Sequence, residues 1–444
     1  MRVKPARGGV GVDCRGFESR ALRMRLTSAV FLPALAAISL AVVLVAIPPA
    51  TWASTATLSL ASGVTALVMM AMAALLGSRW AWLEDVFGGL DRVYEVHKWL
   101  GVWALVLASV HLVFKAGTPD WEVASILPLP PYWTRLVRQL SYVALVLIVL
   151  LALNRKIPYG QWRWWHKLSG PLFVVVVLHW LSFKSPIALG SPAGLWLAAC
   201  ATLGLAGAAY KLLLYPFVSQ HAEYRLTRVD LGVASVRLEL EPVGQGVNFE
   251  AGQFAFLRLL HAGLREPHPF TLASAGGEGR PVQFVIRALG DYTDRLVAEA
   301  RPGMRAEVYA PFGRFRRPPA GDFEVWIGGG VGLSPFIAWL HDASRQDLAK
   351  VTLFNFQTPG RGFPGVDALA ADARKRGADW VEVHDGPDSA VFAKRFGWLI
   401  GQVGAGHVSV CFCGPRGLLT RVRAEMARHG VPASKLRFEQ FEFR

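Results

Sequence analysis

Four histidines lie at or inside two apolar stretches of the chain, where polar side chains are costly. His97 and His111 belong to YEVHKWLGVWALVLASVHLVFK (94–115), and His166 and His179 bracket the run KLSGPLFVVVVL. A lone histidine in such a place usually bonds to a neighbouring helix, but two pairs on two helices indicate metal ligands. The apolar surroundings and the lack of a nearby carboxylate favour haem iron, although zinc also accepts histidine.

The spacing of the histidines predicts how each pair projects from its helix. His97 and His111 are fourteen positions apart, about four helical turns or ~21 Å, so both side chains point the same way. His166 and His179 are thirteen positions apart, which leaves them about 140° out of phase on a straight helix. Pro171 lies between them and is able to kink the helix. Whether that kink brings the second pair into phase is left open by the sequence.

The elements that must position these histidines are membrane spans. Hydrophobic residues form 53% of the 444 residues and charged residues only 18%, and the apolar excess precedes about residue 215. Apolar runs close to the ~20 residues of a bilayer span predict six transmembrane helices. The runs are 27–47, 57–76, 97–114, 139–153, 166–183 and 193–215.

Lys and Arg are concentrated before the first run and in the loops after the second and fourth runs. This bias predicts that the N-terminus and the C-terminal half are cytosolic. His97 and His166 then share the cytosolic side, and His111 and His179 share the outer side. The net charge of +15 is explained by this topology; without a basic stripe carrying interleaved aromatics, we expect no nucleic-acid partner.

The first 25 residues are basic and Gly-rich and are expected to be a disordered extension, or else the chain starts at Met24. No small-residue cleavage site follows the first run, so we interpret it as a retained span rather than a signal peptide. The four cysteines show neither a C-x-x-C pair nor an iron–sulfur spacing.

The second half of the chain changes its hydrophobic period. Short β-rich segments separated by Gly or Pro predict an antiparallel barrel over roughly 221–318. Strand, Gly turn and helix signals then alternate over roughly 322–444, which predicts a parallel α/β sheet. The predicted domains are an extension at 1–25, a six-helix membrane domain at 26–215, an antiparallel barrel at 216–318 and an α/β domain at 319–444.

Four motifs in this half carry the remaining chemistry. They are HPFTLAS (268–274), IRALGDYT (286–293), GGGVGLSPF (328–336) and CGP (413–415). The Gly turn follows a strand and opens a helix, so its backbone amides can approach a pyrophosphate. It departs from G-x-G-x-x-G because Leu333 stands at the last Gly position. Arg287, in the second motif, is a natural bidentate phosphate partner.

Together these motifs resemble the ferredoxin-NADP reductase-like dehydrogenases, in the form carried by NADPH oxidases and ferric reductases. The resemblance covers about 27–444, and the histidine spacings of 14 and 13 also match the haem-bearing helices of that family. Because no calcium-binding hands are present, the chain is similar to the compact bacterial form.

The resemblance implies a set of cofactors and the residues that hold them. Two b-type haems would use His97 with His166 and His111 with His179. FAD would contact His268, Pro269, Phe270, Thr271, Arg287 and Thr293. NADPH or NADH would contact Gly328, Gly329, Gly330, Gly332, Ser334, Pro335, Cys413, Gly414 and Pro415.

Three residues are candidates for a catalytic role by the same resemblance. Cys413 would lie near the nicotinamide, and Phe441 or Phe443 would cover the flavin face. Each has a structural alternative: Cys413 as a small buried core residue, and the two phenylalanines as part of a last edge strand. Arg361 would hold a 2′-phosphate of NADPH or is an ordinary surface turn residue.

The resemblance implies transmembrane electron transfer from cytosolic NAD(P)H through FAD and two bis-histidine haems to an acceptor outside. We expect oxygen as this acceptor, giving superoxide; the alternatives are a ferric chelate, or a partner protein or quinone. The loop 115–138 is expected to cover the outer haem, with Lys115, Arg135 and Arg138 attracting an anion. The expected location is a bacterial-type inner membrane, with membrane lipid around the spans and no obligatory protein partner.

Overall fold

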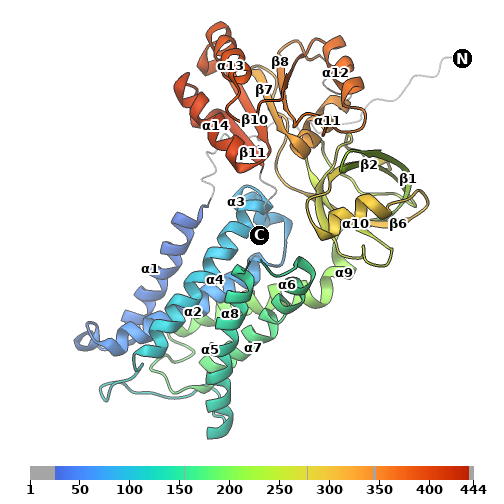
Figure 1. Ribbon diagram of the computed structural model, residues 1–444. Helices are drawn as coiled ribbons and strands as arrows, with labels where there is room; N and C mark the ends of the chain where they lie inside the picture. The colour runs from blue at the N-terminus through green and yellow to red at the C-terminus, as the bar shows by residue number, and fades with distance from the viewer. Residues whose placement is uncertain (1–25, 155, 278, 343, 345–346, 440–444) are drawn as a thin grey trace, which may run out of the picture.

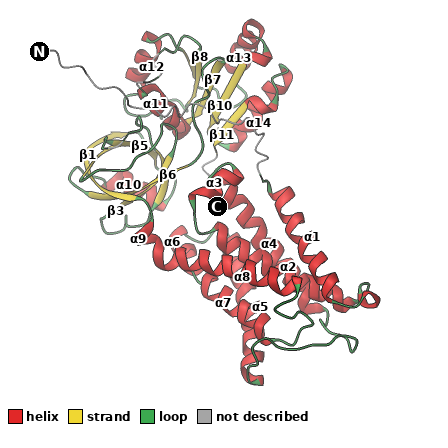
Figure 2. Cartoon of the chain, turned by 180° about the vertical axis from the view of Figure 1, so that it is seen from behind, coloured by secondary structure: helices red, strands yellow, loops and turns green. Residues whose placement is uncertain are grey.

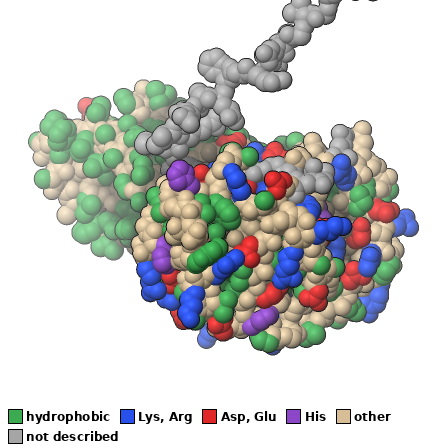
Figure 3. Space-filling model, turned by 90° about the horizontal axis from the view of Figure 1, so that it is seen from above, with side chains coloured by type: hydrophobic (Ala, Val, Ile, Leu, Met, Phe, Trp, Pro, Cys, Tyr) green, Lys and Arg blue, Asp and Glu red, His purple; other side chains and the backbone are tan. Residues whose placement is uncertain are grey.

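The computed structural model describes residues 26–154, 156–277, 279–342, 344 and 347–439. A bundle of long helices forms one part of the molecule, and two sheets with their own helices form the other (Figures 1 and 2). Hydrophobic side chains cover the helical part, whereas Lys, Arg, Asp and Glu are spread over the part that contains the sheets (Figure 3). The change in composition along the sequence therefore corresponds to a change in architecture.

Five helices among the described residues are long and apolar enough to cross a membrane. They are α1 (Ser28–Ala46), α2 (Thr55–Leu76), α4 (Leu90–Val113), α5 (Pro131–Leu153) and the stretch Pro192–Val218, which contains α8 (Pro192–Ala209), a π-helical segment η2 (Tyr210–Leu214) and α9 (Tyr215–Val218). The chain thus has several helices suited to a multi-pass membrane protein, as the apolar runs predict.

The structure differs from the six predicted spans in two places. The run 166–183 contains α7 (Ser169–Ser182), a helix of only 14 residues, preceded by α6 (Tyr159–His166). The short run 139–153 is the end of the longer helix α5, which begins at Pro131 because proline is well placed in a first helical turn. The loop expected at 115–138 therefore ends before Pro131. A further short helix, α3 (Ala81–Phe87), joins α2 to α4.

Helix α2 lies at the centre of the bundle. About 67% of its most apolar window is buried, against 11–28% for the other four candidate spans. Small residues allow α8 to approach it closely: a methyl group added at Gly204 would lie 2.8 Å from the Ala71 Cα atom, and one at Gly207 would lie 2.9 Å from the Leu75 Cα atom. Close backbone approach through small residues is the usual packing mode inside membranes.

The first sheet is antiparallel and has six strands in the order β4-β3-β6-β1-β2-β5. Its strands are β1 (His221–Gly232), β2 (Ser235–Pro242), β3 (Phe254–Leu259), β4 (His268–Thr271), β5 (Val282–Arg287) and β6 (Arg305–Phe312), with helix α10 (Asp291–Glu299) between the last two. Inward-facing residues such as Tyr224, Leu238 and Phe284 are fully buried. This is the antiparallel, near-barrel sheet that the short β-rich segments predict.

The second sheet is parallel and has five strands in the order β11-β10-β7-β8-β9. Its elements are β7 (Phe323–Gly329), a single turn η3 (Gly330–Leu333), α11 (Ser334–His341), β8 (Val351–Phe356), α12 (Val366–Lys375), β9 (Asp379–Val383), α13 (Ala390–Val403), β10 (Val408–Cys413), α14 (Arg416–Arg428) and β11 (Leu436–Glu439). Strands β7, β8 and β10 are buried along their length, as expected for a sheet covered by helices on both faces.

The two parts of the molecule meet at the short helix α3. The buried carboxylate of Glu84 accepts a hydrogen bond from the Gly313 amide at 2.8 Å, directly after β6. Arg314 pairs with Asp85 at 3.0 Å, and the Arg92 guanidinium lies 5.7 Å from the Phe438 ring centroid. Helix α3 and the start of α4 therefore contact both sheets and fix the barrel over the end of the bundle.

We expect Gly204→Leu to destabilise the bundle, because the new side chain would meet the α2 backbone. Overpacking of this kind costs about 1–3 kcal/mol and should lower the apparent melting temperature in detergent. Ala206→Leu is the matched control, since Ala206 lies on an exposed face of the same helix. Equal melting temperatures for the two variants would contradict the close α2–α8 packing.

A second prediction concerns Glu84, which lies outside the five candidate spans. Burial raises the pKa of its carboxyl group to about 7. Between about pH 4.5 and 7 the folded protein keeps a proton on Glu84 that the unfolded chain has lost. The free energy of unfolding therefore decreases as pH rises through that window. We expect melting temperature to fall less between pH 5 and pH 8 in Glu84→Gln than in the unmodified protein. The same dependence of melting temperature on pH in both proteins would refute the raised pKa of Glu84.

Candidate functional site

The structure brings the four membrane histidines together as two facing pairs. The ring centroids of His97 and His166 are 5.9 Å apart, and those of His111 and His179 are 6.3 Å apart; both pairs have an interplanar angle of 74°. Two imidazoles that bind one metal ion from opposite sides should have centroids about 6 Å apart, given metal–nitrogen bonds of ~2 Å. Each pair has the separation expected of two axial ligands.

The two histidines of α4 are oriented by the backbone of α2. His97 Nδ1 lies 2.8 Å from the Ala73 carbonyl oxygen, and His111 Nδ1 lies 2.9 Å from that of Ser59. A ring nitrogen that faces a carbonyl carries the proton and donates it, which leaves Nε2 with a free lone pair for a metal. Gly63 permits this approach, because a methyl group there would lie 2.7 Å from His111 Nδ1.

The second pair comes into phase because its residues do not share one helix. His166 is the last residue of α6, and His179 lies near the end of α7. The break at Lys167 and Leu168 falls one turn before Pro171, which has no amide hydrogen for the Lys167 carbonyl. The Nδ1 atoms of both histidines are buried and meet no hydrogen-bond partner in the part of the chain that the structure describes.

The described residues contain no group of three or more His, Cys, Asp or Glu side chains suited to hold a metal ion. A structural or catalytic zinc site usually has three or four protein ligands. Two imidazoles alone instead suit a metal whose other positions are filled by a macrocycle. The geometry thus favours haem over zinc among the two alternatives that the sequence leaves open.

A cavity of about 1280 Å³ connects the His97–His166 pair with strand β4 of the first sheet. His97 and His166 line one end, and His268, Pro269 and Phe270 line the other. Basic side chains are common in its wall: Arg79, Arg92, Lys98, Arg163, Lys167, Lys211, Arg258, Arg416 and Arg423. The cavity is therefore suited to large cofactors that carry negative charges.

Arg79 and Lys211 are prominent in this wall and were not singled out by the sequence. Arg79 adopts a left-handed backbone conformation (φ 63°), donates to the Tyr94 hydroxyl and lies 3.9 Å from the Phe256 ring centroid. The Lys211 ammonium lies 3.3 Å from the ring centroid of Tyr215. The GSRW turn that contains Arg79 marks a loop in the sequence, but nothing there predicts an inward guanidinium.

Aromatic rings link the inner histidine pair to the first sheet. The Trp162 ring stacks on His166 at 5.2 Å and 13°, and Tyr159 lies 5.4 Å from Trp162 and 5.0 Å from His268. His268 stacks in turn on Tyr292 at 3.7 Å. Tyr159, Trp162 and His166 recur at helical spacing in the sequence, a signal that could have placed all three on one face of α6.

Strand β4 carries the motif predicted to hold FAD. Thr271 pairs with Phe254 of β3, and its hydroxyl is buried without a hydrogen-bond partner among the described residues. Burial lowers the pKa of His268, whose Nε2 lies 3.4 Å from Glu266. A buried hydroxyl without a partner, one residue after the cavity-lining Phe270, is suited to a polar ligand atom.

The side chains of Arg287 and Thr293, both in the second flavin motif, have different surroundings. Arg287 donates from Nη2 to the Arg361 carbonyl at 2.9 Å, and a methyl group at Gly330 would lie 3.3 Å from its Nη1. The Thr293 hydroxyl stays within its own turn, donating to Gly290 and accepting from Leu289. The structure thus places Arg287 beside the Gly turn, whereas Thr293 closes the start of α10.

The Gly turn and the CGP motif lie against each other. Strands β7 and β10 are parallel with Gly328 opposite Cys413, and a methyl group at Gly332 would lie 2.0 Å from the Cys413 carbonyl oxygen. A methyl group at Gly329 would likewise lie 2.9 Å from the Pro415 Cδ atom, too close without a shift of the neighbouring chain. Ser334 and Pro335 begin α11, where the Ser334 hydroxyl donates to the Val331 carbonyl at 2.8 Å.

Cys413 is fully buried within the core of the parallel sheet. Burial, with a smaller contribution from the Glu439 carboxylate, raises the pKa of its thiol well above the usual range, so the thiol stays protonated. This environment suits a small packed residue better than a nucleophile. The other two candidates for a catalytic role, Phe441 and Phe443, lie outside the described residues.

The segment before α5 covers the His111–His179 end of the bundle. Ala124 and Ser185 form an antiparallel bridge, and the Leu127 amide donates to the Leu181 carbonyl at 2.8 Å. Lys115 is exposed, and the Arg138 guanidinium lies 5.9 Å from the Phe183 ring centroid, next to His179. This side therefore offers cationic side chains near the outer pair.

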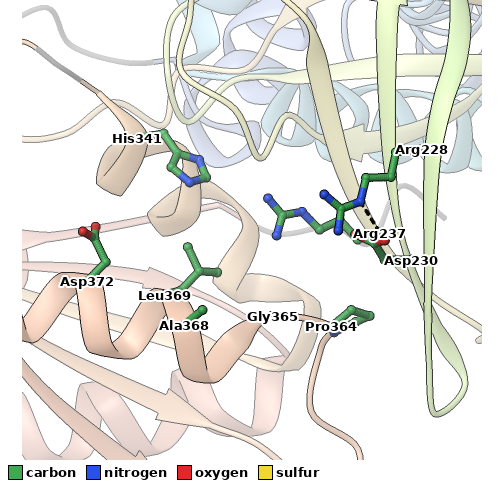
Figure 4. A pocket seen from close by; sticks show the side chains of 9 residues that line it. All are labelled: Arg228, Asp230, Arg237, His341, Pro364, Gly365, Ala368, Leu369 and Asp372. Atoms are coloured by element: carbon green, nitrogen blue, oxygen red, sulfur yellow. Dashed lines mark hydrogen bonds and ion pairs between the residues drawn. The ribbon is translucent and has the colours of Figure 1, made fainter.

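A second cavity, of about 580 Å³, lies between the two sheets on a different face. Arg237 extends across it towards His341, while Arg228 pairs with Asp230 at 2.8 Å (Figure 4). Helix α12 and the preceding loop form its floor with Pro364 and Leu369 (Figure 4). The residues predicted from the sequence do not line this cavity.

The comparisons with known proteins agree with this architecture. Residues 62–177 match the family described as "Ferric reductase like transmembrane component". Dual oxidase 2 of Sus scrofa is 28% identical over 302 residues, 57% of this chain and 18% of that protein. A probable cell surface ferric reductase of Aspergillus oryzae is 24% identical over 301 residues, 62% of this chain and 39% of that protein.

The chain therefore spans less than half the length of these two curated relatives. Among solved structures, the flavohem-like FAD/NAD binding domain of nitric oxide dioxygenase from Vibrio cholerae is 18% identical, with a TM-score of 0.42, over 49% of this chain and 98% of that one. The match to the family covers most of α2, all of α4 and α5 and much of α7, and it includes His97, His111 and His166, whereas His179 lies two residues beyond it. The chain thus has a helical part similar to a ferric reductase-like transmembrane component, followed by a part with two sheets, and it is similar in sequence to a dual oxidase and to a probable ferric reductase.

Proposed function

We propose that this protein is a flavocytochrome oxidoreductase that moves electrons across a membrane. The electrons would come from NADPH or NADH, pass through FAD and two b-type haems, and reach an acceptor on the other side. We assign the haems to residues 26–215, FAD to 216–318 and the nicotinamide nucleotide to 319–444. The single observation that carries this proposal is that the four histidines form two facing pairs, with ring centroids 5.9 and 6.3 Å apart.

The residues of the inner site fit a haem. His97 presents Nε2 because Ala73 accepts from its Nδ1, and His166 faces it across the cavity. Arg79 and Lys211 would neutralise the propionates, because buried cations need an anionic partner and neither has a carboxylate within ion-pair distance among the described residues. When bound, the haems and FAD would supply the conversion of a two-electron donor into one-electron transfers.

The outer site fits a haem by the same reasoning. His111 presents Nε2 because the Ser59 carbonyl accepts from its Nδ1, and His179 faces it. If His111 and His179 both hold the haem iron, they would leave no open position on it for oxygen. Reduction of an acceptor would then take place at the haem edge.

In the dehydrogenase part, the chain's own residues would bind and orient the two nucleotides. Thr271 offers a buried hydroxyl to the flavin, and Arg287 offers a guanidinium to phosphate beside the Gly turn. The close packing of Gly332 against Cys413 holds the Gly turn next to the CGP motif, and the backbone amides of this turn would bind the nucleotide phosphates. Arg361 is exposed at the end of β8 and would contact a 2′-phosphate if NADPH is the donor.

We propose oxygen as the first acceptor, which would give superoxide. The similarity to a probable cell surface ferric reductase supports a ferric chelate as the second candidate. A partner protein or quinone is the third candidate from the sequence. Arg138, beside the outer pair, would attract either an anionic chelate or superoxide.

We also propose an inner membrane of the bacterial type, with both termini on the cytosolic side. The Lys and Arg bias of the loops supports this orientation. It places α3, α6 and both sheets on the cytosolic side, where NAD(P)H is available.

Replacing His111 tests the outer site. We expect His111→Ala to reduce the haem content from two to about one per chain, because one axial ligand is lost. Pyridine haemochrome analysis of the purified protein measures this content. His261→Ala is the control, because His261 is exposed on the first sheet and should retain both haems. Full haem content in His111→Ala would exclude His111 as a ligand.

The acceptor is tested with purified protein loaded with FAD and haem. Oxidation of NADPH and of NADH is followed in air, with and without superoxide dismutase, and then anaerobically with a ferric chelate. We expect cytochrome c reduction that superoxide dismutase suppresses. Fast chelate reduction without a superoxide-dependent signal would instead favour the ferric reductase, and no NAD(P)H oxidation with any acceptor would contradict both.

A further inference from the structure

Helix α6 presents two different faces at the end of the bundle nearest the first sheet (Figure 1). Tyr159, Trp162 and His166 form one face, which contacts the inner cavity and His268. Trp164 and Trp165 lie on the other face and are 60% and 48% exposed. The centres of the two faces are about 150° apart around the helix axis.

The exposed face is continuous with a cationic surface. Leu168, 42% exposed, follows the two tryptophans, and Lys156 and Lys167 are exposed on either side of the helix. The stretch 156–168 contains no Asp or Glu. Tryptophan and lysine together are typical of the headgroup region of a bilayer, and lysine is attracted by anionic lipids.

We propose that α6 binds the headgroups of anionic phospholipids through Lys156, Trp164, Trp165 and Leu168, and that this contact positions the inner haem ligand His166. The helix has only eight residues, so a lipid contact on one face constrains the ring stack of Trp162 on His166 on the other. The break at Lys167 and Leu168 separates α6 from α7, so His179 is not constrained in the same way.

The second part of this inference rests on the proposed function, because it assigns His166 to the inner haem. Lipid phosphates held near His166 would place negative charge beside the iron and favour its oxidised form. Anionic lipid should therefore make the inner haem harder to reduce, while the outer haem, on the far side of the membrane, responds less.

The test uses the full chain with its cofactors in nanodiscs of phosphatidylcholine, with or without about one-third phosphatidylglycerol. At a fixed potential, we expect phosphatidylglycerol to lower the reduced fraction of the inner haem about twofold in the unmodified protein. Lys156→Glu should abolish this response, because it repels the lipid phosphates. Lys184→Glu is the matched control, since Lys184 is exposed beyond the opposite end of α7.

A second measurement reports the contact without using the haem. The fluorescence of Trp164 and Trp165 is obtained as the difference between the unmodified protein and the Trp164→Phe, Trp165→Phe double variant. Brominated phosphatidylglycerol should quench this fluorescence more strongly than brominated phosphatidylcholine does. Equal quenching would show contact with neutral lipid and overturn the anionic-lipid proposal.

The possible failures are distinguishable. An unmodified protein without two haems contradicts the proposed function, while the quenching result still decides the lipid contact. Two haems whose reduced fractions do not depend on lipid overturn the positioning of His166. If the reduced fraction of the inner haem still depends on phosphatidylglycerol in Lys156→Glu, the dependence reflects the general surface potential of the membrane. This result also overturns the positioning of His166 by the lipid contact.

Discussion

The facing imidazole rings of the bundle are the constraint on which the rest of the architecture depends. A separation near 6 Å leaves room for one metal ion between two rings, and both pairs keep it, at 5.9 and 6.3 Å. Helix α2 orients one ring of each pair, because its carbonyl groups accept hydrogen bonds from both α4 histidines. The glycines at 63, 204 and 207 let α4 and α8 lie close enough to α2 to keep that geometry.

The same constraint extends to the part of the chain that contains the two sheets. The cavity shared by His97, His166 and His268 brings strand β4 of the first sheet beside the inner histidine pair. The contact between Glu84 and Gly313 holds the end of β6 against the bundle, and the phenylalanines at 254, 256 and 312 pack into the membrane core cluster. The barrel is thus fixed by polar and apolar contacts that lie next to the cavity.

Local patterns were sufficient for much of the fold and for the pairing of the histidines. Apolar runs predicted the long helices, and the strand and Gly-turn motifs predicted the two sheets. The break between α6 and α7 was not predictable, because Pro171 shows only that a helical bond is missing and not where the chain turns. Arg79 and Glu84 were missed for a different reason: their roles depend on contacts with Tyr94, Phe256 and Gly313, which the sequence does not bring together.

Electron paramagnetic resonance of the oxidised, unmodified protein tests the central claim most directly. If each histidine pair, with ring planes at 74°, holds one haem iron, the protein should show two low-spin ferric signals with strong anisotropy, since the ligands and their orientation set the electronic structure of the iron. Reduction with dithionite should abolish both signals. A high-spin signal as the main species, or a single low-spin species per chain, would contradict the two bis-histidine sites.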